Sequence, residues 1–443
     1  MPKDEVARDT IAAVATPAGR GGIGIVRISG ALVPRIAEVL LGALPAARRA
    51  RYAAFRDARG ERLDEGIALY FPAPRSYTGE PVLELQGHGG PVVIRSVLAA
   101  CLDAGARLAE PGEFTRRAFL QGRLDLAQAE AVADLIDAAS REAARSALRS
   151  LSGEFSAVIA ALASELVELR ALTEAMLDFP EEEVASLHRG DAASRLARIR
   201  AALEQVNAKS REGSLLRTGI HVVLAGRPNV GKSSLLNRLA GEERAIVTAV
   251  PGTTRDALRE TIQLDGVPVI LVDTAGLRPA SDLIERLGIE RTQRELAGAD
   301  LVLAVFEAGK PEPQLADLPA GAPRIDVYNK LDLVPDFVPA PRAWPAVAVS
   351  ARTGAGLDRL RRLILESAGW HSSGESVFLA RERHLRALER ARAHLLAAAD
   401  EQGRWELFAE ELRLAHASLS SITGEFTADD LLGEIFARFC IGK

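Results

Sequence analysis

The sequence predicts a multidomain α/β protein with three parts. These are an N-terminal α+β domain, a helical-bundle domain, and a domain with a doubly wound sheet that is inserted into the bundle. Two observations support this prediction. Apolar runs of strand length alternate with helical patterns over 216–371, and helical spacing of apolar residues flanks that region on both sides. Such an insertion is tolerated because the two termini of a domain often lie close together.

The composition is that of a globular protein with more than one core. A chain of 443 residues has room for about two to four domains. Hydrophobic residues make up 48% and charged residues 26%, and the net charge of −5 gives no sign of an extended nucleic-acid surface, although it leaves room for a local basic patch. Two cysteines cannot build a disulfide framework, and neither a signal sequence nor an 18-residue apolar run is found. We therefore expect a cytoplasmic protein with no membrane contact.

The first predicted domain covers 1–118 and mixes strands with a helix. Strand-like apolar runs occupy 10–15, 24–28, 66–71 and 82–86. The segment 91–104 is amphipathic and predicts a helix, which places Cys101 in the core. Clusters of glycine at 17–22 and 88–90 predict turns between these elements.

The predicted helical domain consists of 119–215 and 372–443. Apolar residues recur at helical spacing over 124–136, 158–172, 196–206, 380–399 and 406–419. Asp191 is expected to cap the helix that contains Leu196, and Thr427 is expected near the capped start of a last helix ending at Phe439. The acidic run over 178–183 contains a proline, which favours a solvated loop over the alternative of a metal site.

The most specific signal is the segment from Gly226 to Ser233, which has the pattern G-x-x-x-x-G-K-S. An apolar run over 220–225 precedes it and a helical pattern follows it. Glycines allow such a loop to curl so that several backbone N–H groups point at one phosphate. In this pattern Lys232 reaches the β- and γ-phosphates, and the Ser233 hydroxyl binds Mg²⁺.

Three further motifs follow in order and indicate that the nucleotide is GTP. Asp273 to Gly276 form an Asp-x-x-Gly motif at the end of an apolar strand. Asn329, Lys330 and Asp332 form the Asn-Lys-x-Asp pattern of GTPases, in which the aspartate accepts the guanine N–H donors that adenine lacks. The segment 350–352 resembles the fifth guanine-nucleotide motif. Four motifs in this order predict a Ras-like P-loop GTPase domain over 216–371.

The segment between the first and third motifs contains Pro251, Gly252, Thr253 and Thr254, which predicts a switch loop. Leu277 stands where many signalling GTPases have the glutamine that orients water. The orienting group must then come from elsewhere, or the enzyme is slow and needs an external activator. The predicted GTP contacts are Asn229, Val230, Gly231, Lys232, Ser233, Ser234, Thr248, Ala249, Val250, Pro251, Gly252, Thr253, Thr254, Asp273, Thr274, Ala275, Gly276, Asn329, Lys330, Asp332, Ser350, Ala351 and Arg352.

Several segments outside the GTPase motifs closely resemble the MnmE (TrmE) family of GTPases that modify tRNA uridine. They are 15–30, 76–80, 83–90, 111–120, 125–132 and the C-terminal Phe439 to Lys443, which contains Cys-Ile-Gly-Lys. Together they span nearly the whole chain, and the terminal motif on a GTPase is highly specific. The resemblance implies cooperation with the flavoprotein MnmG (GidA), as a heterotetramer, to add an aminomethyl or carboxymethylaminomethyl group at C5 of the wobble uridine of certain tRNAs. FAD enters only through that partner.

The resemblance also implies that the N-terminal domain forms a homodimer and binds 5-formyl-tetrahydrofolate or a related one-carbon folate. Arg27, Glu84, Arg123 and Lys443 match the family's folate contacts. Guanidinium groups suit the carboxylates of the glutamate tail, and a carboxylate suits the pterin N–H donors. The family often has a lysine at the position of Arg123, so the geometry of that contact is open. From the sequence alone, a surface charge is the preferred interpretation of Arg27, Glu84 and Arg123.

For the GTPase domain the resemblance implies stimulation by K⁺ and activation by pairing of two G domains. Asn229, Thr248, Val250 and Thr253 match the K⁺ ligands, and Ser233 and Thr254 match the Mg²⁺ ligands. Glu285 matches the residue that orients the attacking water, so Glu285 and Lys232 are the expected catalytic residues. Without the resemblance, an exposed helix carboxylate is the preferred interpretation of Glu285.

Two alternatives to this function are open, as is the role of Cys440. A ribosome-assembly GTPase would need a basic RNA-binding module, and none is evident. A folate-dependent one-carbon transferase would use the GTPase only for regulation. The Cys440 thiol is either a nucleophile, which needs a lowered pKa, or a structural or redox-sensitive group.

Overall fold

The computed structural model describes residues 9–178, 184–242, 259–273, 299–312, 322–371, 377–401, 403–425, 435–436, 439 and 442, and every structural statement below concerns these residues. The chain divides into two compact units. The first unit is Met1–Ala133 with Leu419–Lys443, and the second is Asp134–Ser418. Within the described residues no helix combines the length and the apolar character that crossing a membrane would need.

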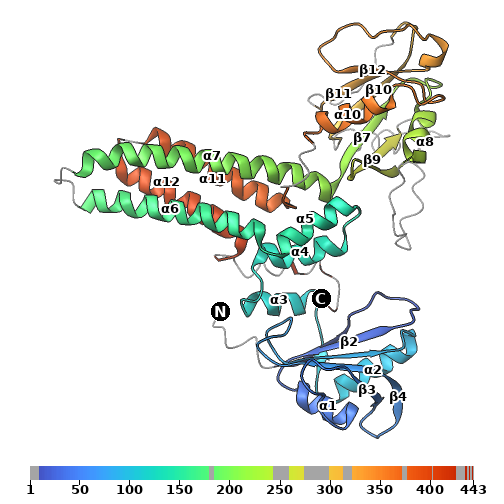
Figure 1. Ribbon diagram of the computed structural model, residues 1–443, viewed down its shortest axis with the longest axis vertical. Helices are drawn as coiled ribbons and strands as arrows, with labels where there is room; N and C mark the ends of the chain where they lie inside the picture. The colour runs from blue at the N-terminus through green and yellow to red at the C-terminus, as the bar shows by residue number, and fades with distance from the viewer. Residues whose placement is uncertain are drawn as a thin grey trace, which may run out of the picture. The chain divides into compact units, whose positions relative to one another are not determined.

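The first unit is built on a six-stranded sheet with the order β3-β4-β5-β2-β1-β6. Figure 1 labels β2, β3 and β4 of this sheet. Its strands are β1 (Ile11–Val14), β2 (Gly24–Ser29), β3 (Arg51–Arg56), β4 (Arg62–Phe71), β5 (Val82–Gly87) and β6 (Arg107–Leu108). Every neighbouring pair is antiparallel except β1 and β6. The four predicted strands are confirmed, whereas β3 and β6 are additions to the prediction.

Three helices accompany this sheet: α1 (Val33–Leu41), α2 (Pro91–Asp103) and α3 (Glu113–Leu120). Ile36 and Leu40 of α1 and Val97 of α2 share one buried cluster with strand residues such as Ile28. Cys101 of α2 is completely buried in that cluster, which confirms its predicted place in the core. Burial also raises the pKa of its thiol to about 12.

The helical part consists of α4 (Leu126–Ile136), α5 (Arg141–Leu151), α6 (Glu154–Asp178), α7 (Val184–Thr218), α11 (Glu382–Asp400) and α12 (Trp405–Thr423). The helix α7 packs against both α6 and α11, and His394 of α11 contacts Glu411 of α12 at 2.7 Å. The prediction that Asp191 caps a helix is wrong. The helix α7 begins at Val184 and continues through Gly190, so Asp191 lies in its interior and accepts a hydrogen bond from Arg195. The segment 179–183 and the expected cap at Thr427 lie outside the described residues.

The second sheet has the order β12-β11-β10-β7-β9-β8, and only the pair β8 and β9 is antiparallel. Its strands are β7 (Ile220–Ala225), β8 (Arg259–Leu264), β9 (Val267–Asp273), β10 (Leu301–Glu307), β11 (Arg324–Asn329) and β12 (Ala346–Ala348). The helices α8 (Lys232–Glu242) and α10 (Leu357–Ser367) and the short 3₁₀ helix η2 (Leu331–Leu333) accompany them. The chain order reverses between β7 and β10, and ligands of such sheets bind beyond the carboxyl ends of the strands at that point.

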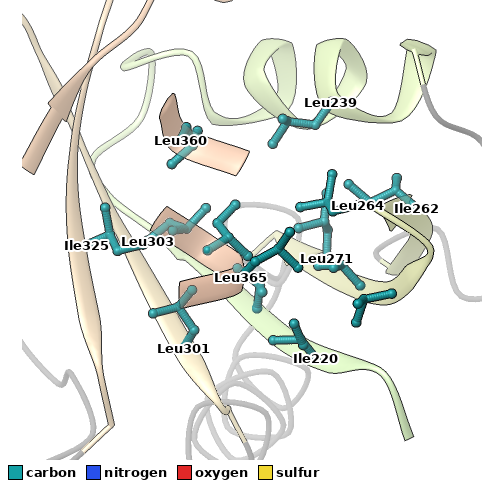
Figure 2. Close-up of a cluster of buried hydrophobic side chains, with 14 of the residues drawn as sticks. Ile220, Leu239, Ile262, Leu264, Leu271, Leu301, Leu303, Ile325, Leu360 and Leu365 are labelled. Atoms are coloured by element: carbon teal, nitrogen blue, oxygen red, sulfur yellow. The ribbon is translucent and has the colours of Figure 1, made fainter. Parts of the chain in front are cut away.

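Figure 2 shows the apolar core of this sheet, which explains why its strands form. Leu239 of α8 and Leu360 of α10 meet strand residues such as Ile220, Leu271 and Leu303, all buried. Strands buried in this way are nearly continuous apolar runs, which is why 220–225 and 269–273 were readily recognised. The doubly wound sheet of the predicted fold class is confirmed.

The sheet domain is inserted between two helices that pack on each other, α7 before it and α11 after it. Both connections lie at the end of α7. The backbone N–H of His371 donates to Glu212 of α7 at 2.9 Å, and a Cβ atom on Gly213 would lie 1.8 Å from the carbonyl oxygen of Phe378. The two ends of the insertion are therefore close together, as the insertion requires. The boundaries predicted for the three domains stay predictions.

Candidate functional site

The phosphate loop connects β7 to α8 and depends on glycine at two positions. Gly231 has a φ of +93°, and a Cβ atom there would lie 2.3 Å from Nδ2 of Asn329. A Cβ atom on Gly226 would lie 2.5 Å from the carbonyl oxygen of Val305. Asn229 also has a positive φ, of +66°, which asparagine tolerates better than most residues. The loop is thus curled tightly, as a backbone cradle for phosphate requires.

Lys232 is the first residue of α8, and its side chain extends back across this loop. Its Nζ donates to the carbonyl oxygens of Gly226 at 2.8 Å and Arg227 at 3.1 Å, and the residue is only 4% exposed. Ser233 and Ser234 follow in the exposed first turn of α8. A buried ammonium group beside the positive end of a helix dipole favours a polyanionic ligand.

Asn329, at the end of β11, joins the phosphate loop to the neighbouring loop after β12. Its Nδ2 donates to the carbonyl oxygens of Val230 at 3.0 Å and Gly231 at 3.3 Å. Its Oδ1 accepts a hydrogen bond from the backbone N–H of Ala351 at 3.1 Å. Asn329 is 2% exposed, so its amide acts as a buried brace between three segments far apart in sequence.

Asp332 is held as a carboxylate beside this brace. Its Oδ1 accepts from the Ser350 hydroxyl at 2.5 Å, and its Oδ2 pairs with Nε of Arg352 at 2.9 Å. The hydrogen bond from Ser350, together with the charge of Arg352, outweighs desolvation and holds the pKa of Asp332 below its usual value. The side chain of Arg352 is 75% exposed, so this partner can be exchanged for another donor at little cost.

Lys330 takes a strained conformation that two other residues support. Its φ is +65°, and its Nζ pairs with Oε2 of Glu307 at 3.0 Å, while Lys310 pairs with Oε1 of the same carboxylate at 2.7 Å. Hydrogen bonds from Lys310 and then Lys330 lower the pKa of Glu307. Glu307 therefore fixes the lysine stem of the Asn-Lys-x-Asp motif, a role that sequence reasoning missed.

The remaining predicted residues of the nucleotide site lie outside the described residues, apart from Asp273. The backbone of Asp273 ends β9, but its side chain is not described. The residues outside are Thr248, Ala249, Val250, Pro251, Gly252, Thr253, Thr254, Thr274, Ala275, Gly276, Leu277 and Glu285.

In the first unit, Arg27 and Glu84 face each other on the paired strands β2 and β5. Nε of Arg27 donates to Oε1 of Glu84 at 2.9 Å, and the two side chains are 20% and 16% exposed. The guanidinium carbon of Arg27 lies 5.4 Å from the ring centre of Tyr77 and 5.8 Å from that of Phe114. We call these four residues the arginine cage.

The C-terminus and Arg123 approach this region. Nη1 of Arg27 donates to the carbonyl oxygen of Gly442 at 3.4 Å, and a Cβ atom on Gly442 would lie 2.3 Å from the carbonyl oxygen of Val14. Arg123 is exposed, and its Cγ would lie 3.4 Å from a Cβ atom on Gly79, in the loop that contains Tyr77. The structure thus brings Arg27, Glu84 and Arg123 to one region, whereas Cys440 and Lys443 lie outside the described residues.

Two sequence profiles match the chain. The profile of the GTP-binding protein TrmE N-terminus matches residues 10–123. The profile of the MnmE helical domain matches residues 126–440, which is more than half of the chain. The chain belongs to the MnmE family.

Individual members of the MnmE family align with the chain almost from end to end. The tRNA modification GTPase MnmE of Azoarcus sp. (strain BH72) is 61% identical over 98% of both chains. The tRNA modification GTPase MnmE of Thiobacillus denitrificans (strain ATCC 25259 / T1) is 58% identical, again over 98% of both chains. A solved structure of the G domain of the T. maritima FeoB iron transporter overlaps 34% of this chain and 98% of its own, with 26% identity and a TM-score of 0.24. The sequence relatives carry the family assignment.

Membership of the MnmE family confirms the resemblance inferred from the sequence motifs. Two residues of the arginine cage, however, were not expected from the sequence. Tyr77 and Phe114 were not predicted as site residues, although both lie in segments that carry the resemblance, 76–80 and 111–120. Spacing along the chain could not reveal them, because their contact with Arg27 arises only when α3 and the 76–80 loop meet β2.

Proposed function

We propose that this protein hydrolyses GTP as a component of an enzyme that modifies the wobble uridine of certain tRNAs at C5. The observation that carries the proposal is the link from the phosphate loop through Asn329 to the loop that fixes Asp332. This link places a phosphate cradle and an ionised carboxylate in one rigid arrangement, as recognition of a guanine nucleotide requires. The relatives that align over the whole chain are named tRNA modification GTPases.

Guanine selection follows from the chemistry of Asp332. Guanine presents N1–H and N2–H donors on one edge, and a carboxylate with two oxygens can accept both, whereas adenine has no such pair. Because Arg352 is mostly exposed, guanine N–H donors can replace it at Oδ2 of Asp332. The Ser350 hydroxyl keeps its hydrogen bond to Oδ1. A site built to pair with such donors discriminates against bases that lack them, because its acceptors would then be left unpaired.

For hydrolysis, the family pattern assigns roles to residues on both sides of the phosphates. Lys232 would bind the β- and γ-phosphates, Ser233 and Thr254 would hold Mg²⁺, and Glu285 would orient the attacking water. Asn229 is the K⁺ ligand in the phosphate loop, with Thr248, Val250 and Thr253 in the following segment. When bound, the two cations neutralise charge that develops on the phosphates, and removing one such preorganised contact typically costs about 100-fold or more in rate. Pairing of two G domains would complete this arrangement.

In the first unit, we assign the arginine cage to a one-carbon folate and the domain to a homodimer. Because Arg27 and Glu84 are paired, they suit one end of the ligand, with Glu84 accepting from pterin N–H donors and Arg27 donating to a neighbouring acceptor; Arg123 and Lys443 suit the carboxylates of the glutamate tail. The partial exposure of Arg27 and Glu84 supports access of a ligand to both charges. The bound folate supplies the one-carbon unit, and the flavoprotein MnmG, which contributes FAD, is the expected partner.

The experiment that tests the proposal is mass spectrometry of tRNA nucleosides after reconstitution. Unmodified tRNA is incubated with the protein, MnmG with its FAD, NADH as the reductant that takes the formyl carbon to the methylene level, GTP, Mg²⁺, K⁺ and 5-formyl-tetrahydrofolate, with glycine or ammonium as the nitrogen source. An aminomethyl-type uridine should appear at the wobble position and should be absent when MnmG is left out. Unchanged wobble uridines in the complete mixture would reject the proposal. Modification that continues unaltered with the Lys232→Ala variant would instead favour a one-carbon transferase that the GTPase only regulates.

The assignment of K⁺ is tested by GTP turnover in matched buffers. Replacing Na⁺ with K⁺ should raise turnover about tenfold or more, since a cation that is correctly held acts like a charge clamp on the phosphates. Asn229→Ala should remove most of this increase, whereas Asn237→Ala, further along α8, should keep it. Equal turnover of the unaltered protein in both salts would reject K⁺ as a ligand.

A further inference from the structure

The ladder between β2 and β5 holds the Arg27–Glu84 pair of the arginine cage, whereas Tyr77 and Phe114 come from segments outside that ladder. Arg27 comes from β2, Tyr77 from the loop at 76–80, and Phe114 from α3. The hydroxyl of Tyr77 lies 2.8 Å from that of Thr115, so the loop and the helix touch at the cage itself. The geometry of the cage therefore depends on what fixes α3 and the loop against the sheet.

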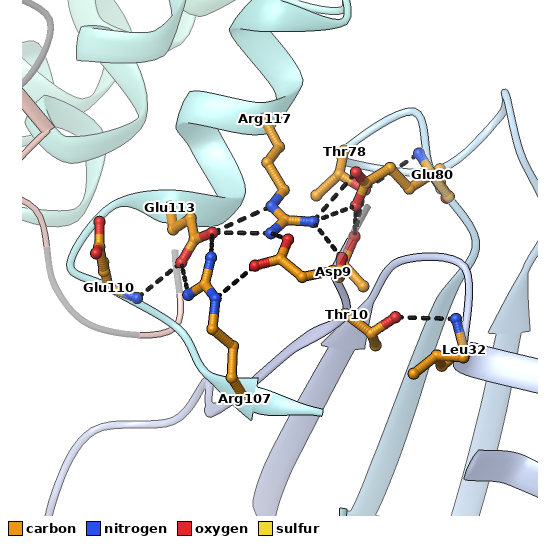
Figure 3. A network of polar contacts seen from close by, with 11 residues as sticks. Asp9, Thr10, Leu32, Thr78, Glu80, Arg107, Glu110, Glu113 and Arg117 are labelled. Atoms are coloured by element: carbon orange, nitrogen blue, oxygen red, sulfur yellow. Dashed lines mark hydrogen bonds and ion pairs between the residues drawn. The ribbon is translucent and has the colours of Figure 1, made fainter. Parts of the chain in front are cut away.

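The buried guanidinium group of Arg117, on the next turn of α3, makes contacts that fix this helix and the loop (Figure 3). Its side chain is 2% exposed. Nη2 donates to Oδ1 of Asp9 at 2.7 Å and to Oε1 of Glu113 at 2.8 Å. Nη1 donates to the carbonyl oxygen of Asp9 at 3.0 Å and to both carboxylate oxygens of Glu80 at 3.2 Å. One residue thus ties α3 to the chain before β1 and to the 76–80 loop.

Glu80 links Arg117 to β2 through a hydrogen bond. Its Oε2 accepts from the hydroxyl of Ser29 at 2.7 Å, and the Ser29 hydroxyl lies 2.7 Å from that of Thr78. Ser29 is two residues from Arg27 on the same strand, and Thr78 is the residue after Tyr77. The network of Arg117 therefore ends next to two of the cage residues, while its own helix carries the third, Phe114.

The shape of the guanidinium group explains why this position requires arginine. Arg117 must satisfy three carboxylates and one carbonyl group that lie in different directions, and a planar fork with five donors can do so. A lysine would retain the charge but has a single nitrogen, which cannot reach all of these acceptors. Without this fork, Asp9 and Glu113 would still have Arg107 and Glu80 the Ser29 hydroxyl, but the guanidinium bridge from α3 to the 76–80 loop would be lost.

We propose that Arg117 is a positioning residue for the arginine cage and so sets the affinity of the first unit for folate. It does not contact the ligand; it holds the 76–80 loop, α3 and β2 at the spacing that Arg27, Tyr77 and Phe114 need. The inference rests on the proposed binding of folate at Arg27 and Glu84. A site whose supporting contacts are removed loses affinity even though every contacting residue is still present.

The test measures the dissociation constant of 5-formyl-tetrahydrofolate by isothermal titration calorimetry with the full-length protein. Arg117→Lys should raise it about tenfold, as expected when a supporting residue is changed. The matched control is Arg116→Lys, the preceding residue of the same helix, which takes no part in the network and should leave it unchanged. Binding of a GTP analogue to the second unit should be equal in all variants.

A double-mutant cycle separates positioning from loss of stability. If Arg117 acts through the cage, Arg117→Lys should raise the folate dissociation constant much less in an Arg27→Lys background than in the unaltered protein. Equal effects in the two backgrounds, or a change below twofold for Arg117→Lys alone, would overturn the inference.

A second variant covers the case in which Arg117→Lys does not fold. Ser29→Ala removes only the hydroxyl between Glu80 and Thr78 and should raise the dissociation constant about threefold, the effect of one buried hydrogen bond; no change would overturn the inference. If the unaltered protein does not bind this folate, the proposed folate site itself fails. That outcome is distinct from a variant that binds as well as the unaltered protein.

Discussion

The phosphate loop of the second unit and the arginine cage of the first unit hold charged groups by different means. The phosphate loop consists of consecutive residues, and its shape depends on backbone conformation, with positive φ angles at Asn229 and Gly231. The cage assembles side chains from β2, β5, α3 and the 76–80 loop, and buried ion pairs hold it. A backbone site is therefore sensitive to added atoms, whereas a side-chain site is sensitive to lost partners.

The largest effect is expected for a substitution in the phosphate loop. In Gly231→Ala, the new Cβ atom would lie 2.3 Å from Nδ2 of Asn329, at a φ of +93° that side chains rarely adopt. Strain of about 1–3 kcal/mol, together with a disturbed buried hydrogen bond, should raise the GTP dissociation constant about 100-fold. Fluorescence titration with a labelled GTP analogue measures this change, and folate binding should remain as in the unaltered protein.

A second glycine nearby supplies the control. Gly241, near the end of α8, has open space where a Cβ atom would lie. Gly241→Ala should leave GTP binding unchanged and raise the free energy of unfolding by about 0.5–1 kcal/mol, because alanine favours the helix. If both substitutions weakened GTP binding equally, the close approach at Gly231 would not be the cause.

The same difference decides how much the sequence could predict. The phosphate loop and the Asn-Lys-x-Asp motif are short and contiguous, and the apolar runs beside them predict strands, so the sequence alone predicts the elements that carry both motifs. The doubly wound sheet and the insertion into the bundle are likewise predicted from patterns of apolar residues along contiguous segments. The prediction for Asp191 is wrong because its residue type favours a cap, whereas α7 begins upstream at Val184 and continues through this position.

What escaped prediction depends on contacts between distant segments. Strand β3 was not predicted, since of its six residues only Phe55 is fully buried and no clear alternation results. The sequence analysis does not single out Arg117 from the adjacent Arg116, and only the fold shows that Arg117 is buried against Asp9, Glu80 and Glu113. A single sequence contains no signal for which of two neighbouring arginines faces a carboxylate cluster.

A smaller effect is expected for the ion pairs that support the arginine cage. It concerns the pH dependence of the stability of the first unit. Burial alone would raise the pKa of Glu113, but hydrogen bonds from Arg107, the backbone and Arg117 outweigh it and hold that pKa below its usual value. The same balance lowers the pKa of Asp9, where Arg107 and Arg117 oppose desolvation. A carboxyl group whose pKa is lowered by folding contributes its full stability above its unfolded pKa of about 4, and this contribution is lost as pH falls through the folded value.

Glu113→Gln isolates this contribution, because the amide cannot change charge. At pH 7 the first unit of the variant should be less stable by about 2 kcal/mol, since two arginines lose a charged partner. The difference in stability should stay constant down to about pH 5 and shrink below pH 4 as the carboxyl group of the unaltered protein takes up a proton.

The measurement uses the reactivity of one buried thiol. In a Cys440→Ser background, Cys101 is the only thiol. Because it is buried in the core of the first unit, its reaction with 4,4′-dithiodipyridine over a urea series reports unfolding of that unit. A difference that stayed the same from pH 7 to 3.5 would show that Glu113 is not held as a carboxylate by these arginines, and the ion-pair network would lose its role as the support of the cage.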